Sequence, residues 1–329
     1  MFGQLQKILD RNFIIGYFVP ALVLVLGSLV LLWFFGINQT LVKVDGQEPL
    51  KDTALAGILS WTVALFYLVV NRQVYRWMEG YRFGLERYVR FPHGLLYESK
   101  QRESATLDKQ FTVAEGMVEE DRVRAARNRF FGSFPRRYPS KKSQLLGTSF
   151  GNTVRAIEDY SRNVYGFESI QGWSRLFTVI PRDYREQMDG QEAFVMFWVN
   201  LWFTFVLLSA LYLALLFVPL YFKSPWILVS LGISAFACLR MARSAAETWG
   251  EWVCGAFDVY LPALATKLKL NDCDTSNERG KMWSDLNQLM VFRDPEAASA
   301  IQDRTRNART AIDATSPEVE DDRVQKCGE

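Results

Sequence analysis

The sequence predicts a mainly α-helical membrane protein with four transmembrane helices and an α-rich cytoplasmic domain between the second and third of them. The strongest sign is residues 193–222, thirty residues without one Asp, Glu, Lys, Arg or His. A helix on the surface of a soluble protein needs a polar face, and this run has none. Charged residues make up 22% of the chain, close to the soluble average. They are concentrated between the apolar runs, and this segregation indicates membrane spans joined by water-exposed segments.

The lengths of the apolar runs define the predicted spans. A helix of thirty residues is ~45 Å long, and bilayer hydrocarbon is ~30 Å thick, so residues 193–222 can cross it with tilt. The run after the turn Lys223-Ser224-Pro225 is short for a crossing, but the turn places it beside its neighbour, so we interpret it as a return span. The four predicted spans are residues 13–35, 53–70, 193–222 and 226–242.

The remaining segments are assigned from their polarity. Two prolines in residues 134–140 predict a turn or loop. Pro262 is expected to bend or end the helix that continues from the last span. The predicted segments are an interfacial helix at residues 1–12, a periplasmic loop at 36–52, a cytoplasmic domain at 71–192, a cytoplasmic helical extension at 243–292, with an amphipathic helix at 281–292, and a disordered tail at 293–329.

The distribution of arginines predicts the orientation in the membrane. Residues 36–52 are net negative, whereas Arg240 and Arg243 follow the last span. The region after the second span holds five arginines within about twenty residues, the range that the positive-inside rule counts. Both termini and the long hydrophilic segment are therefore predicted to be cytoplasmic, in the inner (plasma) membrane of a bacterium.

Small and polar side chains inside the spans predict how the helices meet. Small residues that recur every four positions allow close helix packing, although such residues can also simply face lipid. Asn200 and Thr204 are one helical turn apart, so they line a wet path through a pore or bond to a neighbouring helix, the commoner role. The predicted packing residues are Ala56, Ser60, Ala64, Ser230 and Ser234.

No pattern of catalytic residues occurs in the chain. It has no Walker loop, no GxGxxG after a strand, no GxSxG and no HExxH. His93 is the single histidine, and the four cysteines form no CxxC pair, so neither a catalytic triad nor a zinc site is expected. We predict no enzyme activity, no metal and no cofactor.

A basic segment within the long hydrophilic region is the first candidate ligand site. Residues 71–190 carry 21 basic and 15 acidic side chains, a net charge of +6. Arginines that bind phosphates, interleaved with aromatic rings that stack on bases, favour a nucleotide or nucleic-acid site. Contact with anionic lipid headgroups and an ordinary solvated helix are the alternatives. The candidate arginines are Arg122, Arg124, Arg127, Arg129, Arg136 and Arg137, among Phe130, Phe131, Phe134 and Tyr138.

Several short motifs resemble those of a family of uncharacterised bacterial multi-span membrane proteins. They are Gly16-Tyr17-Phe18-Val19-Pro20, Asn71-Arg72 with Glu79-Gly80-Tyr81, Gly151-Asn152-Thr153-Val154-Arg155-Ala156 with Glu158 and Tyr160, Tyr165-Gly166 with Trp173 and Arg175, and Trp249-Gly250-Glu251 with Ala256-Phe257-Asp258 and Tyr260. The resemblance extends to about residue 290 and assigns no activity. Ser174 and Leu261 depart from it, where a proline and an arginine would be expected.

The middle motif is the second candidate ligand site. Arg155, Glu158 and Arg162 stand three and four residues apart, so they can pair along one helix face. They form either a structural polar network, the commoner case, or a ligand pocket that uses Arg155 and Arg162.

These observations suggest a homo-oligomeric membrane effector or channel that its basic cytoplasmic domain gates, with a nucleotide or oligonucleotide as the signal. The architecture is similar to that of membrane-acting effectors of bacterial anti-phage systems. The alternative is a non-conducting membrane anchor or scaffold that recruits a soluble partner protein. An enzyme with an unrecognised membrane-embedded site is the least supported hypothesis, because the chain offers no nucleophile and base.

Overall fold

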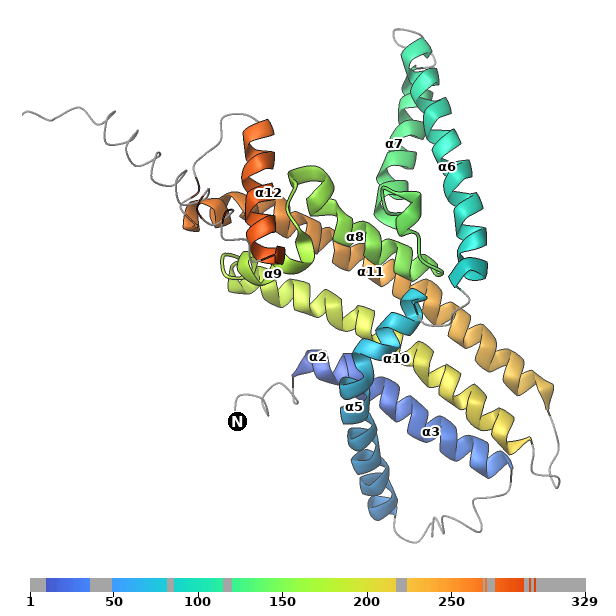
Figure 1. Ribbon diagram of the computed structural model, residues 1–329. Coiled ribbons are helices and arrows are strands. Elements are labelled where there is room, and N and C mark those ends of the chain that lie inside the picture. The colour runs from blue at the N-terminus through green and yellow to red at the C-terminus, as the bar shows by residue number, and fades with distance from the viewer. Residues whose placement is uncertain are drawn as a thin grey trace, which may run out of the picture. The chain divides into compact units, whose positions relative to one another are not determined.

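The computed structural model describes residues 10–35, 49–81, 86–114, 120–216, 224–268, 270, 276–292, 296 and 299. All regular structure within these residues is helical (Figure 1), which confirms the predicted mainly α fold. The chain forms two compact units, which we describe separately. The first comprises Met1–Glu158 and Pro181–Cys254, and the second Asp159–Ile180 and Gly255–Glu329.

Four helices are long and apolar enough to cross a membrane, as predicted. The first consists of α2 (Arg11–Phe13), the π-helix η1 (Ile14–Phe18) and α3 (Val19–Phe34). The others are α5 (Pro49–Glu79), α10 (Arg182–Leu215) and α11 (Pro225–Lys267). Most of the predicted interfacial helix, residues 36–48 of the predicted loop, the last residues of the third span and nearly all of the tail lie outside the described residues. The predicted loop extends too far, because α5 already begins at Pro49.

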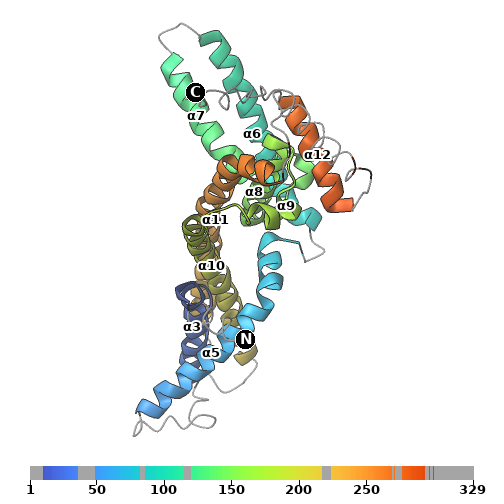
Figure 2. The ribbon, with the colours of Figure 1, turned by 90° about the vertical axis from the view of Figure 1, so that its left-hand side faces the viewer.

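All four membrane helices contribute to one apolar core in the first unit, α11 through Ala242 and Ala246. Figures 1 and 2 show α3 beside α10, and Ala21 of α3 lies in the same buried cluster as Ala64 of α5 and Val199 of α10. Of the predicted packing residues, Ser60 and Ala64 are fully buried and Ala56 is half-buried. Ser230 is exposed and Ser234 only half-buried, so the buried small residues of α11 begin further along, at Cys238, Ala242 and Ala246.

Asn200 and Thr204 join α10 to the first span. Pro20 carries no N–H, so the Gly16 carbonyl lacks the donor that position 20 of an α-helix would supply. The Asn200 Nδ2 donates to the Gly16 carbonyl oxygen at 2.8 Å instead, and the Thr204 Oγ1 donates to that of Pro20 at 3.2 Å. The Tyr67 hydroxyl of α5 lies 2.7 Å from the Thr204 Oγ1. Both polar side chains are fully buried, so in the single chain they bond to neighbouring helices and line no open path.

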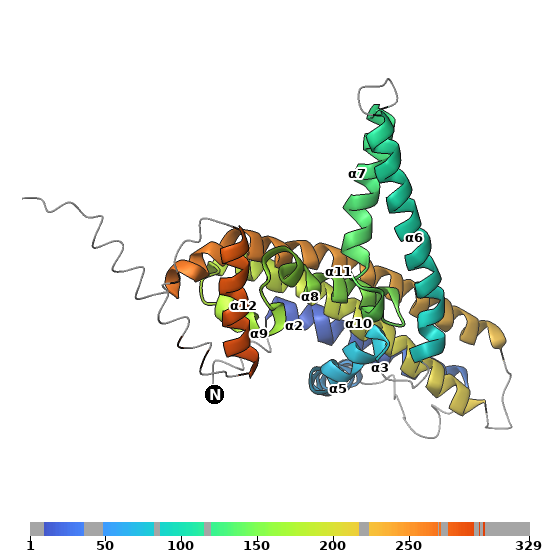
Figure 3. The same ribbon diagram turned by 45° about the horizontal axis from the view of Figure 1, so that its top comes forward.

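The hydrophilic region begins with a hairpin of α6 (Glu86–Ala114) and α7 (Glu120–Arg137), which lie side by side in Figures 2 and 3. The prediction of a turn or loop at residues 134–140 is wrong in part, because α7 continues through Pro135 to Arg137. Pro135 has no N–H, so the helix lacks one backbone hydrogen bond there, and stacked rings on one face compensate for it. The centre of the Phe134 ring lies 5.2 Å from the ring centres of both Phe130 and Tyr138. Tyr97 of α6 packs on this stack and is buried.

The second unit contains the end of α8 (Ser149–Tyr165), α9 (Ser169–Leu176), the end of α11 and α12 (Ser276–Phe292). Its core is aromatic, with Phe167 in contact with Phe257 and Trp283. The α11 helix passes through Pro262 and ends at Lys267, so Pro262 does not end it. The predicted helix at residues 281–292 lies within α12, which buries Trp283 and Leu286.

Candidate anion-binding site

The candidate site forms where α5 leaves its apolar stretch. Gly80 ends the helix because it adopts φ +94°, a conformation that residues with a Cβ rarely adopt. The Gly80 N–H donates to the Trp77 carbonyl at 3.1 Å, and the Tyr81 N–H donates to the Arg76 carbonyl at 3.2 Å. This pair of bonds is a Schellman motif, which brings the residue after the glycine back toward the last helical turn. Tyr81 is thereby held beside Arg76.

The end of α5 is joined to the start of α8 at backbone distance. The Thr148 Oγ1 donates to the Met78 carbonyl of α5 at 2.7 Å and accepts from the Gly151 N–H at 2.9 Å, which caps α8. A Cβ at Gly151 would overlap the Glu79 carbonyl oxygen. The buried Asn152 side chain fixes the loop before α8 by pairing with both the N–H and the carbonyl of Leu146. We call this contact the α5–α8 joint.

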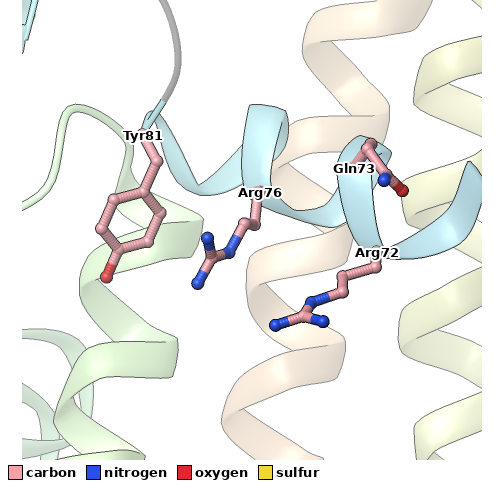
Figure 4. A pocket seen from close by; sticks show the side chains of 4 residues that line it. All are labelled: Arg72, Gln73, Arg76 and Tyr81. Atoms are coloured by element: carbon pink, nitrogen blue, oxygen red, sulfur yellow. The ribbon is translucent and has the colours of Figure 1, made fainter.

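A cleft of about 360 Å³ lies against this end of α5, lined by Arg72, Gln73, Arg76 and Tyr81. Figure 4 shows the guanidinium groups of Arg72 and Arg76 on the same side of the helix as the Tyr81 ring. The Arg76 guanidinium carbon stands 5.6 Å from the centre of that ring, within the range of a cation–π contact. The Tyr81 hydroxyl is protonated at neutral pH, as tyrosines ordinarily are, and burial raises its pKa further, so it can donate a hydrogen bond.

The charges around the cleft favour an anion. Among the described residues, no carboxylate forms an ion pair with Arg72 or Arg76. Behind the cleft, Glu79 is only 7% exposed and interacts electrostatically with Arg76, Arg155 and Glu158. The Arg155 Nη1 is 2.8 Å from the Glu158 Oε2, so this pair compensates itself. The cleft is therefore lined by two guanidinium groups, the Gln73 amide and the Tyr81 phenol, with no carboxylate among these four side chains.

The arginines predicted from the sequence do not gather into one site. Arg127 pairs with Asp108 at 3.0 Å, Arg137 pairs with Glu247 at 3.0 Å, and Arg136 pairs with Glu251. Phe130, Phe134 and Tyr138 among them are stacked within the α6–α7 hairpin. Arg124 is exposed, and the side chains of Arg122 and Arg129 lie outside the described part.

The second predicted set is divided between the two units. Arg155 pairs with Glu158 in the first unit, and the Arg162 Nη2 lies 2.5 Å from the Glu168 Oε2 in the second. Of the pairs that the spacing allows, the structure shows Arg155 with Glu158, whereas Arg162 pairs with Glu168. In the second unit the Tyr160 and Tyr165 hydroxyls both donate to the Asp258 Oδ1, at 2.8 and 2.7 Å.

The residues that line the cleft were not predicted as a site, although their motif was recognised. Arg72 and Arg76 are one helical turn apart and directly follow the apolar run, and Glu79-Gly80-Tyr81 comes next. An i, i+4 arginine pair before a helix-ending glycine is the signal that could have indicated them. The structure also brings two of the quoted motifs together, because Glu79-Gly80 contacts the segment that begins at Gly151.

Comparison with family models, curated proteins and solved structures gave no match. Within the described residues, no group of three or more His, Cys, Asp or Glu side chains could hold a metal ion.

Proposed function

We propose that this protein is a homo-oligomeric membrane effector of the bacterial inner (plasma) membrane, with both termini and the α6–α8 region in the cytoplasm. The four apolar helices support the membrane location. The arginines at the end of α5 and beyond the apolar part of α11 support the orientation. Its helices would assemble with those of other copies into a pore or another permeabilising structure.

The α5–α8 joint carries the functional part of the proposal. The α5 helix runs unbroken from its apolar stretch to Glu79, where Thr148 and Gly151 of the α8 end hold it. A shift of α8 therefore has to move the end of a membrane helix, since close-packed backbones cannot deform independently. Such a contact suits a protein in which the cytoplasmic region controls the membrane helices.

The signal in this proposal is a phosphate-bearing ligand, such as a nucleotide or oligonucleotide. Arg136 and Arg137 of the basic segment already pair with carboxylates, whereas Arg72 and Arg76 have no such partner among the described residues. The cleft is thus the better place to receive an anion. A role in anti-phage defence is the setting that the architecture suggests.

Dye leakage from proteoliposomes tests the proposal. We expect the full chain to release trapped dye, and nucleotides or oligonucleotides to change the rate. Gly151→Ala should abolish this response, because the new Cβ overlaps the Glu79 carbonyl and opens the joint. Gly190→Ala is the matched control, since a Cβ at position 190 of α10 meets no atom within 4 Å. The absence of any leak, together with a monomer in detergent, would refute the proposal.

A non-conducting anchor or scaffold is the second candidate. Leu95 and Leu96 of α6 are 54% and 52% exposed, so the hairpin presents apolar side chains to a soluble partner protein. A stoichiometric partner that needs both leucines, in a chain that conducts nothing, would favour this function.

A further inference from the structure

We infer that the cleft of Arg72, Arg76 and Tyr81 binds a phosphate monoester, carried either by a membrane lipid or by a soluble ligand. The inference names the ligand class of the candidate site and rests on the proposed function for the side of the membrane on which the cleft lies. It is argued below from the geometry of the donors, their depth relative to the membrane and the size of the cleft.

The donors match a dianion. Arg72 and Arg76 are one turn apart, and Figure 4 shows both guanidinium groups directed to the same side of α5. Guanidinium groups bind phosphate oxygens through paired N–H donors, and two of them balance the charge of a monoester, about −1.5 to −2 at neutral pH. The Tyr81 hydroxyl, which is protonated at neutral pH, supplies one more donor.

Backbone contacts hold Tyr81 and the turn of α5 that carries Arg76 in place. The Schellman bonds at Gly80 and the cation–π contact fix Tyr81 beside Arg76, and the Thr148 bond to Met78 anchors the same turn of α5 to α8. A preorganised site loses less side-chain entropy on binding than flexible surface arginines do. Arg72 and Arg76 are exposed, so the fixed position of Tyr81 is what distinguishes the cleft from an ordinary basic rim beside the membrane.

The depth of the two arginines fits a lipid phosphate, while the volume of the cleft also admits a soluble ligand. Arg72 and Arg76 lie about 3 and 9 Å along the helix axis beyond Val70, the last apolar residue of the run. The headgroup layer extends roughly 5–8 Å beyond the hydrocarbon, so the arginines flank the lipid phosphates. A volume of about 360 Å³ is within the range of small-ligand sites.

The test measures binding to the full chain in nanodiscs and separates the two sources of phosphate. In one arm, some neutral phosphatidylcholine is replaced by phosphatidic acid, a lipid monoester, and native mass spectrometry counts the retained lipid. In the other arm, AMP and inorganic phosphate are titrated by calorimetry into phosphatidylcholine nanodiscs. Retention of phosphatidic acid alone assigns a lipid ligand, and binding of the soluble phosphates alone assigns a soluble one. Binding in neither arm overturns the inference.

Matched variants separate the cleft from general membrane electrostatics. Arg76→Gln should weaken binding about tenfold, the effect of losing a hydrogen bond to a charged group. Tyr81→Phe should weaken it by about threefold, since only one neutral donor is lost. Arg240→Gln removes an exposed arginine of α11, a different membrane helix from the one that carries the cleft. It should change the affinity less than about twofold. Unchanged melting temperatures show that the variants are folded.

Two results would contradict the inference even if binding is seen. Equal losses for Arg76→Gln and Arg240→Gln would mean that net charge alone attracts the ligand. Equal retention of phosphatidylglycerol, a diester with a single charge, would exclude selectivity for a monoester. A cleft that binds phosphate in a chain that never leaks and is a monomer in detergent would refute the proposed effector function and leave the inference standing.

Discussion

Single residues decide whether the end of α5 has the shape described. Gly80 adopts φ +94°, and a Cβ there would stand 3.1 Å from the Gly147 nitrogen. Gly151 is in a similar position, since its missing side chain lets the Glu79 carbonyl approach. Neither constraint concerns side-chain chemistry. Both follow from two backbones that meet where any Cβ would keep them apart.

Gly80→Ala should lower the free energy of unfolding by about 1–2 kcal/mol, the cost of a left-handed conformation for a residue with a Cβ. It should also weaken phosphate binding, because Tyr81 would no longer be held beside Arg76. Thermal melting in detergent measures the first effect. Gly57→Ala on the same helix is the control and should be neutral or slightly stabilising, since a Cβ at Gly57 meets nothing within 4 Å and alanine is the better helix former. Equal melting temperatures for the two variants would disprove the constraint.

Glu79→Gln should strengthen binding of phosphate in the cleft. Burial raises the pKa of the Glu79 carboxyl to about 7, so above that pH it is mostly ionised and opposes an incoming anion, whereas the amide keeps the shape without the charge. The expected gain is about threefold to tenfold above pH 7 at low salt, and less at high salt, where screening grows, or below pH 7, where Glu79 is mostly protonated. Calorimetric titration of AMP or retention of phosphatidic acid measures it. Weaker binding by this variant would mean that Glu79 positions Arg76 and does not compete with the ligand.

At the scale of helices, the contact between α10 and the first span depends on a backbone defect. Pro20 removes an N–H donor from the first span, and Asn200 of α10 supplies a replacement to the Gly16 carbonyl. Thr204 makes the next contact one turn along α10. The two helices are therefore matched at a defined register, which apolar side chains alone would specify poorly.

A double-mutant cycle tests this compensation. Asn200→Leu should lower the free energy of unfolding by about 1–2 kcal/mol, because it leaves the Gly16 carbonyl without a partner in an apolar core. In a Pro20→Ala background the loss should be smaller, since the new N–H at position 20 can bond to Gly16 within the helix. Ser209→Ala is the control, because the Ser209 hydroxyl bonds only to its own helix at Phe205. Additive losses would show that Pro20 and Asn200 are independent.

At the scale of the whole molecule, the predicted sides of the membrane can be tested by cysteine labelling. The native cysteines are replaced by serine, and one cysteine is introduced at Gln47 or at Ser140. A membrane-impermeant maleimide should label position 47 in intact cells and position 140 only after permeabilisation, since the arginine-rich segments face the cytoplasm. The reverse pattern would invert the orientation and with it the proposed site of ligand entry.

The membrane helices were predictable because apolar runs of that length have few other uses. The helix at Pro135 was not, because the stack of Phe130, Phe134 and Tyr138 on Tyr97 of another helix outweighs the local cost of the proline. The cleft was not predictable either. The spacing of Arg72 and Arg76 is visible in the sequence, but the place of Tyr81 depends on Gly80 meeting Gly147, a contact between distant segments.

The π-helical segment Ile14–Phe18 gives the first span a widened turn. Such a turn accommodates one residue more than an α-turn, so the helix can lose a residue there and close into regular geometry. Removing Ile15 should therefore leave Ala21 and Val25 facing the core. The same deletion within α3, at Leu26, would rotate every later side chain by about 100° and turn Leu31 away from its neighbours.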